Sequence, residues 1–183
     1  MQFSDVQLDG VSLQLAHPDD AATVSAVMQR IYRALYAYLW IDGGESFLNT
    51  IFSPHALRRE LEDKNQPCWI ICCEGKQIGI LKLTLDVAPG DIPDAHSIKL
   101  HRIYMDAAFH GRGIGSAILR FVEDTARSAG AHNIWLESMA SEPGVRKFYE
   151  KHGYAYVKDV TLPYPNGKPE FSRMLRMENK LEN

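Results

Sequence analysis

Three glycines at alternate positions, Gly111, Gly113 and Gly115, lie where a strand pattern changes into a helix pattern. Glycine costs backbone entropy, so such a cluster usually has a reason, most often the close approach of another group to the backbone. The first amides of a helix lack intrahelical acceptors and favour an anion. Arg112 would add a cation beside them. The pattern predicts a pyrophosphate site, although a turn that merely lets the helix pack on the strand would show the same glycines.

The segments on either side of the glycines must position that site. Upstream, apolar and bulky residues over 98–105 predict a buried strand. Downstream, apolar residues recur at helical spacing from Ile114 to Val122. The spacing is not that of a dinucleotide-binding fingerprint, because Ser116 stands where a third glycine is needed and Glu123 falls in the middle of the helix.

A second group of residues, Phe148-Tyr149 followed by Gly153-Tyr154, lies further along the chain. Pro143 can occupy the first turn of a short helix over 143–152, and Gly153 can end it. The phenol of Tyr149 is able to donate a proton, or its ring simply packs in the core.

Together these two motifs resemble the GNAT superfamily of N-acetyltransferases. The segment from His110 to Gly115 is similar to the family's acetyl-CoA signature, Gln/Arg-x-x-Gly-x-Gly/Ala, with His110 in place of Gln or Arg. The segment from Phe148 to Tyr154 resembles the family's F-Y-x-x-x-G-F motif. The resemblance covers about residues 5–178 and is specific over 98–153.

This resemblance implies an acyltransferase that uses acetyl-CoA and transfers its acetyl group to a primary amine by direct attack. Tyr149 would lie near the CoA sulfur and protonate the thiolate, and a backbone N–H from 103–105 would polarise the thioester carbonyl. The residues implied to bind the cofactor are Ile103, Tyr104, Met105, His110, Gly111, Arg112, Gly113, Ile114, Gly115 and Ser116.

The attacking amine must be neutral, whereas a free alkylamine has a pKa near ~10, so a base or a water chain should remove its proton. Glu137 ends a Trp-Leu-Glu strand, where ribosomal-protein-type relatives carry a catalytic Glu, and is slightly favoured. His101 occupies a central-strand position that is often Glu in relatives, and His96 lies just upstream.

Some positions depart from the family pattern. Relatives often have an Asn at 142 or 144 that contacts the cofactor, whereas this chain has Glu142 and Gly144. These changes keep a second hypothesis open, that of a non-catalytic acyl-CoA-binding regulatory module. The presence of Tyr149 with an intact glycine turn favours the enzyme.

The sequence leaves the acceptor open among a polyamine, an amino acid, an aminoglycoside, a peptide N-terminus and a lysine side chain. The segment from Phe47 to Phe52 is similar to the spermidine/spermine-type and small-amine branch. Asp86, Asp91 and Asp94 could hold a cationic amine, or belong to a solvated loop. Family members are often dimers, so the resemblance also leaves a homodimer open.

Composition excludes several other functions. The chain has 183 residues, 45% of them hydrophobic and 23% charged, which is typical of one domain over 1–183. The net charge of −3 argues against nucleic acid as a partner. No apolar run reaches the ~18 residues of a membrane span, and the N-terminus shows no signal pattern, so we expect a cytoplasmic protein.

No metal site is expected either. Cys68, Cys72 and Cys73 lack zinc spacing and are interpreted as reduced thiols. The seven histidines include no helical H-x-x-x-H pair.

The predicted elements combine into an α/β (α+β) fold, with a mixed, mostly antiparallel central sheet, one parallel strand pair and helices on both faces. The parallel pair joins 98–105 to 133–139, because a strand–helix–strand unit favours that arrangement. The remaining strands are expected at 6–15, 68–74, 77–87, 154–160 and 171–177.

Overall fold

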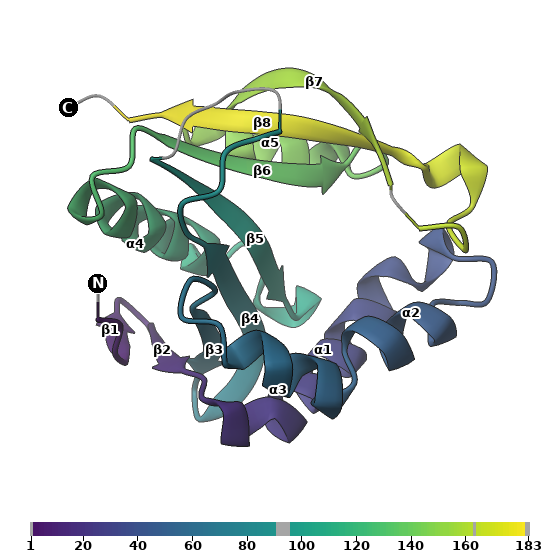
Figure 1. The fold of residues 1–183 in the computed structure, drawn as a ribbon, viewed down its shortest axis with the longest axis horizontal. Helices are drawn as coiled ribbons and strands as arrows, with labels where there is room; N and C mark the ends of the chain where they lie inside the picture. The colour runs from purple at the N-terminus through teal and green to yellow at the C-terminus, as the bar shows by residue number, and fades with distance from the viewer. Residues whose placement is uncertain (1, 91–95, 163, 182–183) are drawn as a thin grey trace.

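The computed structural model describes residues 2–90, 96–162 and 164–181. Their strands form one mixed sheet in the order β1-β2-β3-β4-β5-β6-β8-β7 (Figure 1). Neighbouring strands are antiparallel except β5 and β6, which run parallel, as the sequence predicts. The strands are β1 (Val6–Leu8), β2 (Val11–Leu15), β3 (Cys68–Cys73), β4 (Lys76–Thr84), β5 (Ser97–Met105), β6 (Asn133–Met139), β7 (Ala155–Thr161) and β8 (Arg173–Lys180). The α-helices are α1 (Ala21–Tyr36), α2 (Glu45–Ile51), α3 (Pro54–Leu61), α4 (Ile114–Ser128) and α5 (Pro143–Lys151).

Helices cover both faces of the sheet, and each face has its own hydrophobic core. The side chains of β3 alternate between the two cores. Trp69 and Ile71 join the core that includes the apolar face of α4, whereas Cys68 and Ile70 join the core built with α1, α2 and α3. In Figure 1 these three helices lie together on one side of the molecule, away from α4.

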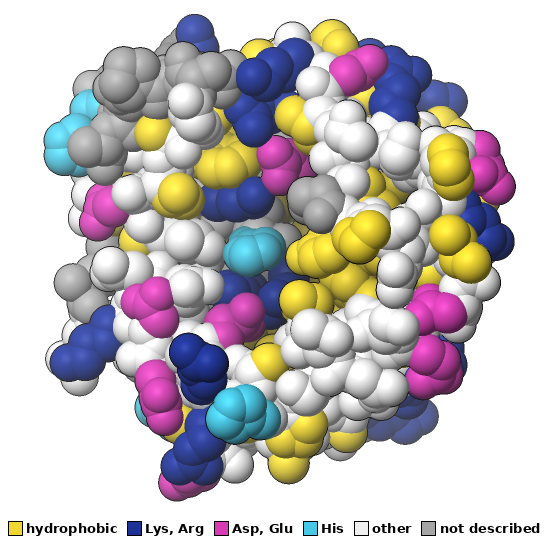
Figure 2. All heavy atoms as spheres, turned by 45° about the vertical axis from the view of Figure 1, so that its right-hand side comes forward, with side chains coloured by type: hydrophobic (Ala, Val, Ile, Leu, Met, Phe, Trp, Pro, Cys, Tyr) yellow, Lys and Arg dark blue, Asp and Glu magenta, His cyan; other side chains and the backbone are white. Residues whose placement is uncertain are grey.

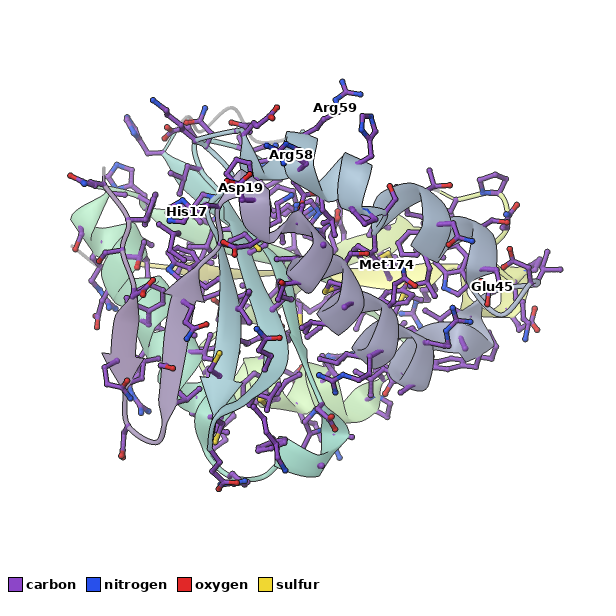
Figure 3. The ribbon with its side chains drawn as sticks, turned by 90° about the horizontal axis from the view of Figure 1, so that it is seen from below. His17, Asp19, Glu45, Arg58, Arg59 and Met174 are labelled. Atoms are coloured by element: carbon purple, nitrogen blue, oxygen red, sulfur yellow. The ribbon has the colours of Figure 1, made fainter. Side chains whose placement is uncertain are left out.

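Local contacts mark the first residues of α1 and α3, two helices of the core built with α1, α2 and α3. A 3₁₀ turn, Pro18–Asp20, precedes α1, and the side chain of Ser53 accepts a hydrogen bond from the amide of Ala56 at 3.2 Å at the start of α3. Arg58 of α3 donates to Asp19 at 3.1 Å, where α3 passes the start of α1 (Figure 3). α3 and α1 are held together mainly by the hydrophobic core that they share, with this exposed ion pair at its edge.

The prediction of one strand over 6–15 is wrong. Residues 6–15 form a hairpin of β1 and β2, in which Leu8 pairs with Val11 across a two-residue turn. Gly10 has a φ of +72°, which a side chain would disfavour. The Asp9-Gly10 pair is a strong hairpin signal that the surrounding alternation of apolar residues concealed.

The parallel strands β5 and β6 separate soon after they begin. They pair at only three positions, Ser97 with Asn133, Ile98 with Ile134 and Lys99 with Trp135. Beyond these positions β5 continues beside β4, and β6 continues beside β8. The sheet therefore splits between β5 and β6, and the edge of β5 towards β6 is left without a strand partner among the described residues.

Candidate active site

A cleft of about 740 Å³ lies where β5 and β6 separate. It is lined by the second half of β5, the end of β6, the glycine turn and α5, and by α1 and α2 on the other side. Figure 2 shows a hollowed face, around which hydrophobic, basic, acidic and histidine side chains gather. The sheet split thus brings both sequence motifs to one cavity.

Two of the three glycines shape the wall of this cleft. Gly111 and Gly113 have φ values of +75° and +80°, and no protein atom lies within 4 Å of a Cβ added at either position. α4 begins at Ile114, so the amides of its first turn have no acceptors within the helix. Ile114, Gly115 and Ser116 also line the cleft. The turn therefore has the open space and the spare donors that an anion needs.

Gly115 also has a packing role, which the other two glycines do not share. A Cβ at this position would lie 3.0 Å from Cζ of Phe148. The absence of a side chain at Gly115 therefore lets α4 pack against α5.

The two polar residues of the first motif occupy different places. Arg112 does not line the cleft, and its guanidinium forms an ion pair with Glu74 and lies 5.1 Å from the ring of Phe109. His110 lines the cleft, with Nε2 3.1 Å from the carbonyl oxygen of Met105. In this structure His110, and not Arg112, is therefore the cleft residue of the pair.

Ser116 connects the two motifs through a residue that the sequence analysis missed. Its Oγ is 2.9 Å from Nε2 of His152, and Nδ1 of His152 is 2.8 Å from the carbonyl oxygen of Phe148. A carbonyl can only accept, so Nδ1 carries a proton, and in the neutral ring Nε2 accepts from Ser116. The sequence does place His152 four residues after Phe148, a helical spacing that brings its ring close to Phe148.

Tyr149 lies at the wall of the cleft, with its ring packed between Phe148 and Tyr154 at centroid distances of 5.3 and 5.4 Å. Burial, followed by the nearby Tyr154 and Tyr104, raises the pKa of Tyr149 above its ordinary value. Its hydroxyl has no hydrogen-bond partner among the described residues. The phenol is therefore protonated at neutral pH and available as a donor.

Glu137 lines the cleft, but cations already contact both of its oxygens. Oε2 is 2.8 Å from Nζ of Lys99, and Oε1 is 3.1 Å from the guanidinium of Arg176. Burial raises the pKa of Glu137, but these two neighbours lower it by more, so it lies below its ordinary value. A carboxylate in this setting is a weak proton acceptor.

His101 stands at a bulge in β5. Lys82 pairs with Arg102 and Leu83 with Leu100, which leaves His101 as the extra residue and turns its side chain into the cleft. Its surface is exposed towards the cleft, yet the surrounding walls desolvate the ring. This desolvation, and then neighbouring cations, lower the pKa of His101 to about 3, so the ring is neutral at pH 7.

The other predicted groups lie outside the cleft. His96 does not line it, and its ring centroid is 5.6 Å from that of His132. Asp86 does not line it either. Asp91 and Asp94 lie outside the described residues.

Glu142 is a second carboxylate of the cleft. In the sequence it stood out only as a departure from the Asn of relatives, and no catalytic role was predicted for it. Its Oε1 accepts a hydrogen bond of 2.5 Å from the hydroxyl of Tyr38. In contrast to Glu137, it forms no ion pair within the described residues. Glu142 is therefore the more available proton acceptor.

A buried charged cluster supports the floor of the cleft. Glu60 of α3 accepts two hydrogen bonds from Arg102 and lies 2.7 Å from Nζ of Lys82. Burial raises the pKa of Glu60, but the charges and hydrogen bonds of Arg102 and Lys82 lower it by more. The carboxylate therefore stabilises the fold above the unfolded-state pKa of about 4.3, and this contribution is lost as the pH falls through the lower folded-state value.

We expect Glu60→Gln to lower the free energy of unfolding by about 3–5 kcal/mol at pH 7, because it leaves two buried cations without a carboxylate. The deficit should shrink as the pH falls through the folded-state pKa of Glu60. Urea unfolding over a pH series measures both effects, with the exposed Glu62→Gln as the matched control. An equal deficit at all pH values would contradict the charge pairing.

Neither a metal site nor a membrane helix is found in the part of the chain that the structure describes. Within those residues no group of three His, Cys, Asp or Glu side chains could hold a metal ion. No described helix is long and apolar enough to cross a bilayer.

Comparisons with known proteins identify the family and the fold of the chain. The profile of the acetyltransferase (GNAT) family matches residues 30–154, more than half of the chain. An uncharacterised N-acetyltransferase of Lactobacillus delbrueckii subsp. lactis is 25% identical over 107 residues, which cover 58% of this chain and 62% of that protein. The N-acetylaspartate synthetase of Danio rerio is 30% identical over 98 residues, covering 52% of this chain and 33% of that protein. The chain thus matches less than two thirds of the length of either curated relative.

Among solved structures, the PaiA N-acetyltransferase of Thermoplasma acidophilum, in complex with coenzyme A, superposes with a TM-score of 0.72. The match covers 93% of this chain and 99% of that one at 17% identity, so it demonstrates the shared fold. With the profile match over both motifs, it shows that the chain belongs to the acetyltransferase (GNAT) family.

Proposed function

We propose that this protein transfers an acetyl group from acetyl-CoA to a primary amine by direct attack. The observation that carries the proposal is the meeting of three features in one cleft. These are the open glycine turn at the start of α4, the unpaired edge of β5 and the free hydroxyl of Tyr149.

The cofactor half of the cleft fits the donor. The amides that follow Gly111 and Gly113 would hold the pyrophosphate, since both positions are open and α4 starts there. Backbone groups of 103–105, which have no strand partner towards β6, would bind the extended amide-bearing arm in the manner of an added strand. Acetyl-CoA supplies the thioester that is attacked.

The chemistry requires three groups around the thioester. As the amine nitrogen bonds to the carbonyl carbon, negative charge develops on the oxygen, and a backbone N–H from 103–105 would stabilise it. The C–S bond then breaks, and Tyr149 would donate its proton to the sulfur. The amine loses one proton, for which Glu142 is a better acceptor than Glu137, because the oxygens of Glu137 are engaged by Lys99 and Arg176.

We expect Glu142→Gln to lower kcat about 100-fold at neutral pH, a usual size for the loss of a general base. Steady-state thiol release measures this effect. Glu150→Gln is the control. Glu150 belongs to α5, forms an exposed ion pair with Arg146 and does not line the cleft. A larger loss of kcat in Glu137→Gln than in Glu142→Gln would return the role of base to Glu137.

The proposal is tested with calorimetry of acetyl-CoA binding and a free-thiol assay on an amine panel. The panel contains amino acids, their decarboxylated amines, spermidine, an aminoglycoside and a lysine-containing peptide. Binding together with amine-dependent thiol release supports the transferase. Binding without release from any amine would support the regulatory module, and no binding would contradict the assignment of the glycine turn.

A further inference from the structure

The side of the cleft that faces α1 and α2 carries basic side chains, whereas a site for a cationic amine would carry acidic ones. At one end of it β5 presents Lys99, His101 and Arg102, here called the basic end. Nζ of Lys99 also lies 4.3 Å from the ring centroid of Trp135. Three donor side chains within four residues of one cleft-lining strand, interrupted only by Leu100, indicate a ligand group that accepts hydrogen bonds.

Positive charge exceeds negative charge at the basic end. Lys82 and Arg102 share the carboxylate of Glu60, while Lys99 pairs with Glu137. Three cations thus face two carboxylates, and the side chains of Lys82, Arg102 and Lys99 are only 1%, 6% and 20% exposed. An excess cation so shielded from water favours an anionic ligand.

Two further charged residues face the same side of the sheet. Arg176 contacts Glu137, and Glu178 lies two residues further along β8. Their opposite charges cancel, so the excess of one positive charge holds among the described residues.

His101 provides a donor rather than a charge. Its Nδ1 is 3.3 Å from Oγ1 of Thr84, and Nε2 has no partner among the described residues. The ring is neutral, because the cleft and the nearby cations depress its pKa. A Thr84 hydroxyl that donates to Nδ1 leaves the proton on Nε2, which can then donate to an anion in the cleft.

An apolar wall adjoins the basic end. Tyr104 lies 5.7 Å from Tyr32 and 5.6 Å from Tyr36, and Phe47 lies 4.9 Å from Tyr164, all as ring centroids. Phe52 joins this wall to the basic end, because its ring lies 5.0 Å below the guanidinium of Arg102. A ligand that binds here meets cations at one end and aromatic faces at the other.

From these contacts we infer that the acetyl acceptor is an amino acid with an apolar side chain. Lys99, His101 and Arg102 bind its carboxylate, and the aromatic wall holds its side chain. The inference rests on the proposed transferase activity, and it selects one acceptor class among those that the sequence leaves open. The reaction is otherwise unchanged, since the amine attacks the thioester and the sulfur leaves with a proton.

The test compares matched acceptors with the wild-type protein. L-phenylalanine is paired with 2-phenylethylamine, and L-leucine with 3-methylbutylamine, with spermidine as a third class. We expect kcat/KM for each amino acid to exceed that of its decarboxylated partner by about 100-fold or more, because the amine alone brings no anion to balance the excess positive charge of the basic end. Equal values, or a preference for spermidine, would overturn the inference and leave the transferase proposal intact. Thiol release from no amine at all would instead count against the transferase proposal.

A variant then identifies the carboxylate ligand. Lys99→Gln should raise KM for L-phenylalanine about tenfold and leave the value for 2-phenylethylamine unchanged, while Lys99→Arg should restore much of the difference. Lys76→Gln, at an exposed position of β4 outside the cleft, is the control. An equal loss on both acceptors would show that Lys99 is structural and overturn its assignment to the carboxylate.

Discussion

Gly113→Ala is expected to weaken acetyl-CoA binding about 10- to 100-fold, which corresponds to losing one or two hydrogen bonds to a charged group. The added Cβ meets no protein atom, so it projects into the open space of the turn where a pyrophosphate would lie. It also places a side chain at a φ of +80°, which costs about 1–2 kcal/mol of stability. Calorimetry measures the binding, and thermal unfolding measures the stability.

Gly130→Ala is the matched control for this prediction. Gly130 follows the other end of α4, has a φ of +69° and is equally open, but it does not line the cleft. Both variants should lose similar stability, and only Gly113→Ala should lose binding. If Gly130→Ala weakened binding as much, the effect would come from destabilisation rather than from the turn.

Tyr149→Phe is expected to lower kcat about 10²- to 10⁴-fold while the Kd for acetyl-CoA stays within a few-fold. The change removes only the hydroxyl, and the ring keeps its contacts with Phe148 and Tyr154. A pure acyl-CoA sensor has no use for the proton, so its response would not change. Thiol release with a saturating acceptor measures the rate.

The control is Tyr154→Phe. Tyr154 packs against Tyr149 but does not line the cleft, and its buried hydroxyl has no hydrogen-bond partner in the part of the chain that the structure describes. Its loss should leave kcat within a few-fold of wild type. If Tyr149→Phe retained full turnover, Tyr149 would not be the proton donor to the thiolate.

The sequence predicts best what depends on local periodicity. The strand–turn–helix–strand unit around Gly111 and Gly113 has clear apolar repeats, and its parallel strand pair is confirmed. The hairpin at Asp9-Gly10 was missed, because apolar alternation continues through the turn. The cytoplasmic location expected from the sequence remains a prediction, and a homodimer remains open.

The chemistry of the site was less predictable, because it depends on contacts between distant elements. Glu137 is a plausible base until β5 and β8 bring Lys99 and Arg176 against it. Glu142 gains importance only when Tyr38 and the cleft are placed beside it. Likewise, no spacing rule shows that Gly115 accommodates Phe148.

A crystal structure of the protein with CoA would show whether this cleft holds acetyl-CoA. We expect the pyrophosphate on the amides of 111–116, the extended arm along 103–105 and the sulfur within hydrogen-bond reach of Oη of Tyr149. CoA bound elsewhere, or a sulfur far from Tyr149, would contradict the proposed cofactor site.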